Sequence, residues 1–524
     1  MTVTDSAYER LGPDRIEHWT SLVTSGSADR FQTWSPGTGE PLAAIPESGV
    51  EDVRLAFARA RERQPGWATT SIGERGKVLL RLHDLVLDRQ TELLDVIQAE
   101  SGKARKHAFE EVCDVALTAR YVARTARRHL STRRRAGVLP VLTDVHERRV
   151  PYGVVGLISP WNYPLTLAIS DALPALAAGN AVVLKPDRQT TLTALFGQQL
   201  LLEAGLPEGL LQVVAGDGPV LGGELVEQAD YVSFTGSTAV GRRIAARCGE
   251  RLIGCTMELG GKNPLLVLDD LNDAGIDRAA EGTIRSCFSN AGQLCIAAER
   301  LFVADRVYDR FVERLLSRVE SMNLGVGFDF GPDMGSLISS AQLDRVRAHL
   351  DDAVAKGATV LSGGNARPDL GPLFFEPTVL TGVTPQMACY GEETFGPLVS
   401  VYRVENDDEA VARANDTSYG LNAMVFGRDP DRARRVAARL RTGSVNIDEA
   451  YTPAWGSMDA PMGGFGASGL GRRHGAEGIR KYTEGQTIAR QRLHPIQPVG
   501  AMSYQRFARL MSLGLRALKR TGRR

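Results

Sequence analysis

The sequence is poor in the features that mark the most easily recognised functional classes. It has six cysteines in 524 residues, and no two of them have CxxC spacing. This argues against a zinc knuckle and against a thioredoxin-like redox motif. The chain also has no net charge, because 62 basic residues balance 62 acidic ones. The bulk composition is therefore not that of a nucleic-acid-binding protein or of a polybasic membrane protein.

The sequence predicts neither a secretory signal nor a membrane-spanning segment. The amino terminus, MTVTDSAYERLGPDRI, carries acidic residues early and has no apolar segment of the kind found in secretory signals. The uncharged run 153–170 is interrupted by Pro160, Asn162 and Pro164, which predicts a buried strand, a turn and the start of a helix rather than a membrane span. We expect a cytoplasmic protein whose thiols stay reduced.

The chain is long enough for more than one domain, since a single hydrophobic core stops growing at roughly 250–300 residues. Apolar runs at 154–159, 181–185, 210–216 and 231–236 alternate with helical patterns, and a second alternation follows residue 258. Such alternation predicts βαβ units and an α/β fold with a doubly wound, mostly parallel sheet. The region from about 50 to 130 has helical periodicity, and the charge-flanked stretch 131–150 is predicted to form a projecting extended arm.

No GxGxxG motif and no Walker lysine mark a phosphate-binding loop. In FTGSTAVGRR, a strand turns directly into a helix at Gly236, and Gly241 follows. A helix N-terminus at such a turn can hold an anion, although an ordinary glycine-containing turn explains the same pattern. Lys185 in LKPDRQT ends an apolar strand, at the edge where open α/β sheets bind ligands, but a solvated lysine is an equal alternative.

Two polar residues stand in positions suited to catalysis. Asn162 lies in PWNYP, where two prolines fix a turn that can aim its amide at a developing oxyanion; it can equally be a simple turn former. Glu258 in MELGGKNP follows an apolar run, and burial there raises the pKa of a carboxyl towards that of a useful base. The alternative is a surface carboxylate paired with Lys262.

Cys295, in SNAGQLC, has no obvious activating partner. A free thiol is only a few per cent thiolate at neutral pH, so a nucleophilic cysteine needs help. None of the eight histidines falls within a motif of the kind described above. Spacing alone favours a structural cysteine.

Taken together in order, the motifs carry more information. Eight motifs follow one another along the chain in this order: PWNYP, LKPD, FTGSTAVG, ELGGKNP, NAGQLC, EETFGP, PMGGFGASGLGR and KYTEGQTIA. This series resembles the aldehyde dehydrogenase superfamily over about residues 35–490. The resemblance implies that superfamily's fold. We expect a Rossmann-like cofactor domain (1–130 and 151–258), an α/β catalytic domain (259–455) and an oligomerisation arm (131–150 and 477–497).

The resemblance also implies roles for particular residues. Cys295 corresponds to the nucleophile that attacks the aldehyde carbon, and Asn162 to the side chain of the oxyanion hole. Glu258 corresponds to the general base that hydrolyses the thioester and so releases a free acid. A non-catalytic ligand-binding or structural protein on the same fold is a remote alternative, and it would predict the loss of one of these three groups.

The cofactor implied by the resemblance is NADP or NAD, and no metal is implied. Arg188 stands where many NAD-using members have glutamate. A cation at this position favours binding of the 2′-phosphate of NADP, whereas the neighbouring carboxylate of Asp187 makes the preference for NADP less clear. The residues expected to contact the cofactor are Ile158, Ser159, Trp161, Lys185, Asp187, Arg188, Gly236, Ser237, Gly241, Glu393 and Phe395.

The substrate is less well defined. The motif forms are similar to a succinate-semialdehyde dehydrogenase branch, yet Ser170 and Ser289 stand where that branch is expected to carry arginine. A substrate carboxylate would then need Arg285, Arg473 or His474. The alternative is an apolar or aromatic aldehyde in a pocket lined by Tyr163, Leu167, Phe288, Trp455 and Phe465. The sequence leaves this choice open.

The partners expected are a second copy of the chain, in a homodimer or homotetramer, and the aldehyde itself. The tail 498–524 is distinct, because residues 504–524 hold seven basic residues and no acidic ones. Apolar residues recur in this segment at helical spacing, namely Tyr504, Ala508, Met511, Leu515 and Leu518. A basic amphipathic helix of this kind can lie weakly on a membrane or pack on a neighbouring subunit.

Overall fold

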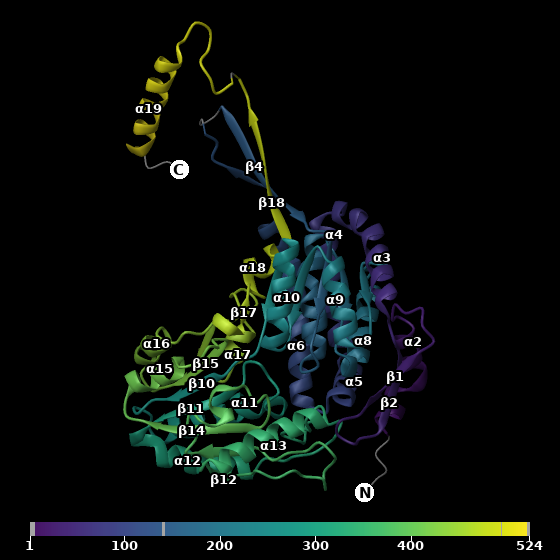
Figure 1. Cartoon of the computed structure of the whole chain (residues 1–524), viewed down its shortest axis with the longest axis vertical. Helices are drawn as coiled ribbons and strands as arrows, with labels where there is room; N and C mark the ends of the chain where they lie inside the picture. The colour runs from purple at the N-terminus through teal and green to yellow at the C-terminus, as the bar shows by residue number, and fades with distance from the viewer. Residues whose placement is uncertain (1–5, 139–141, 494, 521–524) are drawn as a thin grey trace.

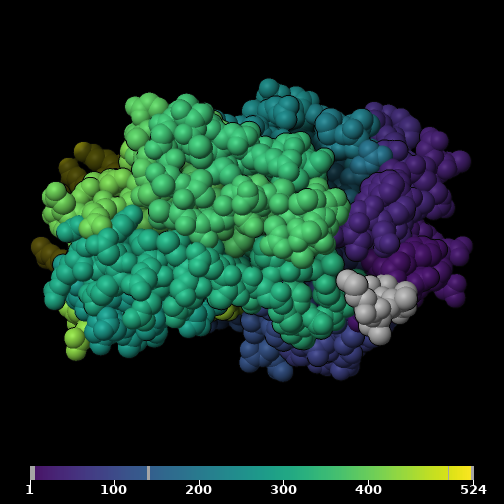
Figure 2. Space-filling model, turned by 90° about the horizontal axis from the view of Figure 1, so that it is seen from below, coloured from purple at the N-terminus to yellow at the C-terminus, as the bar shows by residue number. Residues whose placement is uncertain are grey.

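The chain folds into two α/β domains and a projecting arm (Figure 1). The computed structural model describes residues 6–138, 142–493 and 495–520. Two large hydrophobic clusters, one in each domain, form separate cores. Figure 2 shows the second domain, in teal and green, beside the purple N-terminal segments.

The first domain is built on a sheet in the order β17-β9-β8-β5-β6-β7. Its strands are parallel except for β17, which runs antiparallel to β9. They are β5 (Val154–Ile158), β6 (Ala181–Lys185), β7 (Leu211–Val213), β8 (Tyr231–Thr235), β9 (Gly254–Glu258) and β17 (Gly469–Leu470). The four runs predicted as strands correspond to β5 to β8, so the prediction of a mostly parallel α/β sheet is confirmed. Residues 469–470, which lie in the PMGGFGASGLGR motif and were not predicted as a strand, close one edge.

Helices cover both faces of this sheet because its strands are apolar on both sides. Those from the N-terminal region are α1 (Ala7–Leu11), α2 (Pro13–Thr20), α3 (Val50–Thr69), α4 (Ile72–Asp88), α5 (Gln90–Ser101) and α6 (Arg105–Leu130). Those between strands are α7 (Ala172–Ala178), α8 (Thr191–Glu203), α9 (Gly218–Gln228) and α10 (Thr238–Arg251). A hairpin of β1 (Arg30–Trp34) and β2 (Pro41–Pro46) packs beside them. The continuous helical pattern near 79–100 is broken at Arg89, whose guanidinium pairs with Glu92 in the first turn of α5.

The second domain holds a sheet in the order β12-β13-β14-β11-β10-β15-β16. Its strands are β10 (Asn263–Val267), β11 (Ala298–Ala304), β12 (Thr359–Ser362), β13 (Thr378–Thr381), β14 (Leu398–Val404), β15 (Asn422–Phe426) and β16 (Ser444–Ile447). Its helices are α11 (Asp273–Phe288), α12 (Asp305–Glu320), α13 (Ser340–Ala355), α14 (Ala388–Gly391), α15 (Asp407–Asn415), α16 (Pro430–Ala437) and α17 (Thr452–Trp455). Only the β12–β13 pair is antiparallel among the described strands of this sheet.

The arm is a three-stranded antiparallel sheet that projects from the first domain (Figure 1). It consists of β3 (Arg133–Arg135), β4 (Thr143–Pro151) and β18 (Thr483–Gln491), with β4 in the centre. Residues 139–141 of the predicted arm lie outside the described residues. The helix α18 (Gly475–Arg480) precedes β18, and α19 (Tyr504–Arg520) follows it. Within the described residues, no helix combines the length and the apolarity needed to cross a membrane.

Candidate active site

A cavity of about 390 Å³ brings the three predicted catalytic residues together. Asn162 comes from the turn after β5, Glu258 from the end of β9, and Cys295 from the loop between α11 and β11. Both domains therefore contribute to the cavity. Its lining residues are Pro160, Trp161, Asn162, Thr235, Gly236, Ser237, Thr238, Ala239, Glu258, Leu259, Gly260, Cys295, Gln342, Arg345, Glu393, Phe395 and Tyr419.

Asn162 is buried and held at both its backbone and its side chain. Its carbonyl accepts a hydrogen bond from Lys103 Nζ at 2.6 Å and another from Asn290 Nδ2 at 3.0 Å. Its own Nδ2 donates to the Gln293 carbonyl at 3.2 Å. One of its two amide hydrogens is thus used within the protein, which leaves the second available to a ligand oxygen.

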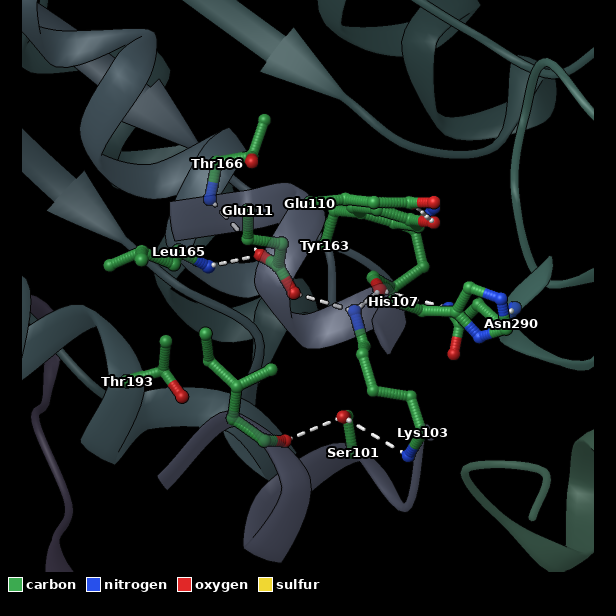
Figure 3. Close-up of polar contacts among 12 residues, drawn as sticks. Ser101, Lys103, His107, Glu110, Glu111, Tyr163, Leu165, Thr166, Thr193 and Asn290 are labelled. Atoms are coloured by element: carbon green, nitrogen blue, oxygen red, sulfur yellow. Dashed lines mark hydrogen bonds and ion pairs between the residues drawn. The ribbon is translucent and has the colours of Figure 1, made fainter. Parts of the chain in front are cut away.

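Lys103 belongs to a buried ion pair that the sequence did not reveal (Figure 3). Its ammonium lies 2.6 Å from Glu111 Oε1, and neither side chain is exposed to solvent. The other oxygen, Glu111 Oε2, accepts hydrogen bonds from the backbone N–H groups of Leu165 at 2.8 Å and Thr166 at 3.1 Å. The Lys103 ammonium also lies 4.0 Å from the ring centroid of Tyr163. The Lys103–Glu111 pair therefore contacts the turn at the Asn162 carbonyl and at the N–H groups of residues 165 and 166, and so holds its shape.

The loop that carries Cys295 has an unusual backbone. Asn290 and Ala291 have φ values of 51° and 54°, in the left-handed region that costs free energy for residues other than glycine. The Asn290 N–H donates to Nδ1 of His107, a buried imidazole whose pKa burial lowers to about 3. Gln293 fixes the same loop: its Nε2 donates to the Asn290 carbonyl, and its Oε1 accepts from the Ile338 N–H, both at 3.0 Å.

The loop is also clamped by its neighbours. Gly292 has φ of 72°, and a Cβ added there would lie 2.2 Å from the Gly396 carbonyl oxygen, so only glycine fits. The Cys295 carbonyl accepts a hydrogen bond from Asn263 Nδ2 at 2.7 Å. Cys295 is consequently held at a fixed position in the cavity wall.

Burial dominates the electrostatics of the cavity. Burial, with a smaller contribution from the nearby carboxylates of Glu393 and Glu258, raises the pKa of the Cys295 thiol to about 12. Burial also raises the pKa of Glu258 to about 8 and that of Glu393 to about 8. The Oε1 atom of Glu258 is buried and accepts no hydrogen bond from any described residue. A carboxyl in this state is suited to exchange a proton with water near neutral pH.

Glu258 is not the surface partner of Lys262. The Lys262 ammonium instead pairs with the buried Glu299 carboxylate. Glu299 in turn accepts hydrogen bonds at 3.0 Å from the N–H groups of Thr394 and Phe395. The Lys262–Glu299 pair therefore positions the 393–395 segment, where Glu393 accepts a hydrogen bond from the Gly261 N–H at 2.8 Å and Phe395 meets Trp161 edge-on at 5.4 Å.

Eight of the eleven residues expected to bind a cofactor fall into two groups. Trp161, Gly236, Ser237, Glu393 and Phe395 line the cavity. Ile158, Ser159 and Lys185 lie at the carboxyl ends of the adjacent strands β5 and β6, where Ile158 is paired with Lys185. The Ser159 hydroxyl is buried and has no partner among the described residues, and the buried Lys185 Nζ donates to the Pro186 carbonyl at 3.1 Å. A sugar with free hydroxyls fits these donors.

Three further candidates lie apart from the cavity. Gly241 is buried in α10, where a Cβ would lie 2.4 Å from Leu259 Cδ2, so its small size serves packing. Asp187 accepts a hydrogen bond from the Gln189 N–H at 2.9 Å and caps the short 3₁₀ turn 188–190. Arg188 is exposed, pairs with Glu47 at 3.1 Å and lies 4.3 Å from the ring centroid of Phe31.

The cations suggested for a substrate carboxylate are engaged or neutral. Arg285 pairs with Glu281 and Glu449, and Arg473 pairs with Asp171 at 2.9 Å. His474 is buried, and burial lowers the pKa of its imidazole to about 3, which keeps it neutral. Arg285 and Arg473 are therefore already paired with carboxylates, and His474 carries no charge to offer a substrate carboxylate.

The apolar residues suggested for the acyl pocket largely cluster. Tyr163, Leu167 and Phe288 belong to the core of the second domain, and Trp455 and Cys295 pack against the same cluster. Phe465 does not join them, because it is 44% exposed and lies beneath the Arg472 guanidinium. Tyr451, which the sequence did not suggest, contacts Trp455 and donates to Glu110 at 2.8 Å, as does Tyr163.

Known proteins of one family share this architecture. The family model described as "Aldehyde dehydrogenase family" matches residues 22–488. A protein of Mycolicibacterium smegmatis named "Putative succinate-semialdehyde dehydrogenase [NADP(+)]" is 52% identical over 483 residues, covering 92% of this chain and 93% of its own.

Solved structures agree with this match. A succinate-semialdehyde dehydrogenase from Burkholderia pseudomallei is 37% identical, with a TM-score of 0.84 over 89% of this chain and 96% of its own. A betaine aldehyde dehydrogenase from Staphylococcus aureus in complex with NAD⁺ is 31% identical, with a TM-score of 0.87 over 94% of this chain and 99% of its own. By motif order, fold and these matches, the chain belongs to the aldehyde dehydrogenase family.

Proposed function

We propose that the protein oxidises an aldehyde to a carboxylic acid through Cys295, Asn162 and Glu258, with NADP as the preferred cofactor and NAD as the alternative. The observation that carries this proposal is the single cavity that holds the thiol, the amide and an unpartnered buried carboxyl. Glu393, Phe395 and Trp161 form the wall of the same cavity and would hold the nicotinamide end of the cofactor.

The residues divide the chemistry between them. The Glu258 side chain is ionised in a growing fraction of molecules as the pH approaches 8. In that form it accepts the thiol proton, and Cys295 Sγ attacks the aldehyde carbon. The Asn162 amide and the Cys295 backbone N–H donate to the oxyanion of the resulting thiohemiacetal. When bound, NAD(P) supplies the hydride acceptor. Once the thioester has formed and Glu258 has passed the thiol proton to solvent, Glu258 takes a proton from water, whose oxygen attacks the thioester carbon. The acid is released, and the departing Cys295 sulfur takes up that proton to become a free thiol.

Two substrate classes are supported by different observations. The names of the M. smegmatis and B. pseudomallei relatives favour succinate semialdehyde. An uncharged aldehyde is favoured instead by two features. Arg285 and Arg473 are already paired with carboxylates, and Tyr163 and Trp455 form an aromatic cluster. Succinate semialdehyde is the leading candidate because the whole-length identity to the first relative is high.

The remaining proposals concern location and assembly. We propose that the protein is cytoplasmic and that it forms a homodimer or homotetramer. The assembly proposal rests on residues 483–490 of β18, which pair with β4 on one side and lie at the edge of the described sheet, where a second copy can add a strand. The basic tail is proposed to make weak contact with a membrane surface.

The substrate proposal is tested with an aldehyde panel at steady state. We expect reduction of NADP by succinate semialdehyde with a higher kcat/KM than by uncharged aldehydes of similar length. Cys295→Ser should abolish turnover while cofactor binding, measured by fluorescence titration, is retained. Turnover by the serine variant would refute the mechanism, and a preference for uncharged aldehydes would replace the leading substrate with the second candidate.

The buried ion pair is predicted to act through Asn162. Asn162→Ala should slow turnover by about 10²–10³-fold, the usual effect of losing one oxyanion-hole donor. Glu111→Gln should slow it by about tenfold or more, since the charge that holds Lys103 and orders the Asn162 turn is lost. The double variant should turn over no more slowly than Asn162→Ala alone, because both changes disable one donor. Glu92→Gln, which breaks the half-buried pair with Arg89 far from the cavity, is the matched control and should leave turnover unchanged. Additive losses would assign Glu111 a purely structural role.

Hydrolysis of the thioester is predicted to depend on the ionisation of Glu258. Burial raises its pKa to about 8, so the base form is lost as the pH falls through that value. The single-turnover rate of acid release should therefore rise by about tenfold per pH unit below pH 8 and level off above it. Glu258→Gln should abolish this rise and let the thioester accumulate, whereas Glu392→Gln, on the exposed neighbour of Glu393, should leave the profile intact. A wild-type rate that is flat between pH 6 and 8 would remove Glu258 from the role of base.

Cofactor choice is predicted to depend on Arg188. Its salt bridge with Glu47 competes with a 2′-phosphate, so Glu47→Gln should raise kcat/KM for NADP severalfold with little change for NAD. Arg188→Gln should lower kcat/KM for NADP by about tenfold. The measurement is kcat/KM with each cofactor for the wild type and both variants; a strong wild-type preference for NAD would overturn the assignment.

A further inference from the structure

The C-terminal helix α19 stands apart from the folded body. It spans Tyr504–Arg520, none of its residues is buried, and it lies beside the far end of the arm (Figure 1). A helix of this length is marginal in water by itself, and Gly514 near its middle weakens it further. Such a helix persists when a second surface covers its apolar face.

Charge is strongly segregated into this end of the chain. The chain as a whole carries no net charge, yet the 40 residues after Glu484 contain nine Lys and Arg residues and no Asp or Glu. The rest of the protein is therefore net acidic by nine charges. The tail is a localised cation on an acidic body, which favours an anionic partner over a neutral one.

The helix separates its apolar and basic side chains. Successive residues turn by about 100°, which places Tyr504, Phe507, Met511 and Leu515 on one narrow face. The side chains of Tyr504 and Leu515 are 72% and 60% exposed. The opposite face carries Arg506, Arg509, Arg516 and Arg520, with Lys519 at its margin and Leu513 as the apolar residue among them.

The segment that leads into the helix extends the apolar surface. Leu493, Ile496 and Val499 are 71%, 43% and 49% exposed. Basic residues Arg490 and Arg492 precede them at the end of the arm. Apolar side chains flanked by arginines therefore recur along the tail, on both sides of the turn at Gly500.

We propose that α19 binds the surface of an anionic lipid bilayer and lies in the plane of its interface. Tyr504, Phe507, Met511 and Leu515 enter the acyl-chain boundary, while the arginines of the opposite face stay at the level of the headgroups and pair with phosphate groups. The association is peripheral and reversible, since the apolar face is only a few side chains wide. This inference deepens the proposed membrane contact of the tail and does not involve the residues of the dehydrogenase reaction.

The test is co-sedimentation of the full-length protein with phosphatidylcholine vesicles prepared with and without phosphatidylglycerol. We expect binding only when phosphatidylglycerol is present, and release at high salt because screening weakens charge attraction. Replacing Arg509, Arg516 and Arg520 together by Gln should lower the partition coefficient on the order of 10²-fold. Met511→Ser with Leu515→Ser should also abolish sedimentation, although the charge is unchanged.

A matched control removes the same charge elsewhere. Arg278, Arg306 and Arg347 are exposed on helices of the second domain, and replacing all three by Gln should leave vesicle binding unchanged. Deletion of residues 503–524 should abolish vesicle binding while dehydrogenase activity persists, which separates this inference from the proposed reaction.

Three results would overturn the proposal. The first is sedimentation that is unchanged after the deletion. The second is equal binding to vesicles of phosphatidylcholine alone. The third combines two observations. The wild-type protein does not bind vesicles, and light scattering gives the protein lacking residues 503–524 a smaller assembly mass than the wild type, because the tail would then pack on a second copy of the chain.

Discussion

The buried ion pair between Lys103 and Glu111 is the constraint on which the geometry of the site depends. Two charges without solvent exposure are costly unless their remaining hydrogen-bonding capacity is used. Here it is used, because the ammonium also donates to the Asn162 carbonyl and the carboxylate accepts two backbone N–H groups. Every one of these extra contacts falls on residues 162–166. The free energy needed to bury the pair is thus recovered only when the Asn162 turn has its native shape.

The same turn connects the two domains. The Asn162 carbonyl accepts from Asn290, and its amide donates to the Gln293 carbonyl, both in the loop that carries Cys295. The left-handed backbone of Asn290 and Ala291 is therefore held by residues of the other domain. Oxyanion donor and nucleophile are set by one connected network, so neither is free to shift alone.

Sequence reasoning found the reacting groups and missed the residues that hold them. Strands β5 to β8 were predictable because short apolar runs bounded by glycine and helical patterns leave few alternatives. The motifs at the carboxyl ends of β5, β6 and β9 named Asn162, Lys185 and Glu258. Lys103 and Glu111 carried no such signal, since each lies in a helical region and meets the Asn162 turn only through tertiary contacts more than 50 residues away in sequence. The same limit explains Lys262, whose partner is Glu299 rather than the neighbouring Glu258. Local pattern cannot determine such distant pairings.

The charged groups around Ser170 bear on the choice of substrate. Ser170, which stands where an arginine was expected, donates to Asp114 Oδ2 at 2.6 Å, and Asp114 Oδ1 is buried with no partner among the described residues. Arg473 forms its ion pair with Asp171, so one guanidinium faces two carboxyl groups. Burial raises the pKa of Asp114 to about 6, so this carboxyl takes up a proton more readily than a solvent-exposed one. A substrate carboxylate that approached Arg473 would have to displace Asp171 or bind with Asp114 protonated, whereas an uncharged aldehyde would need neither change.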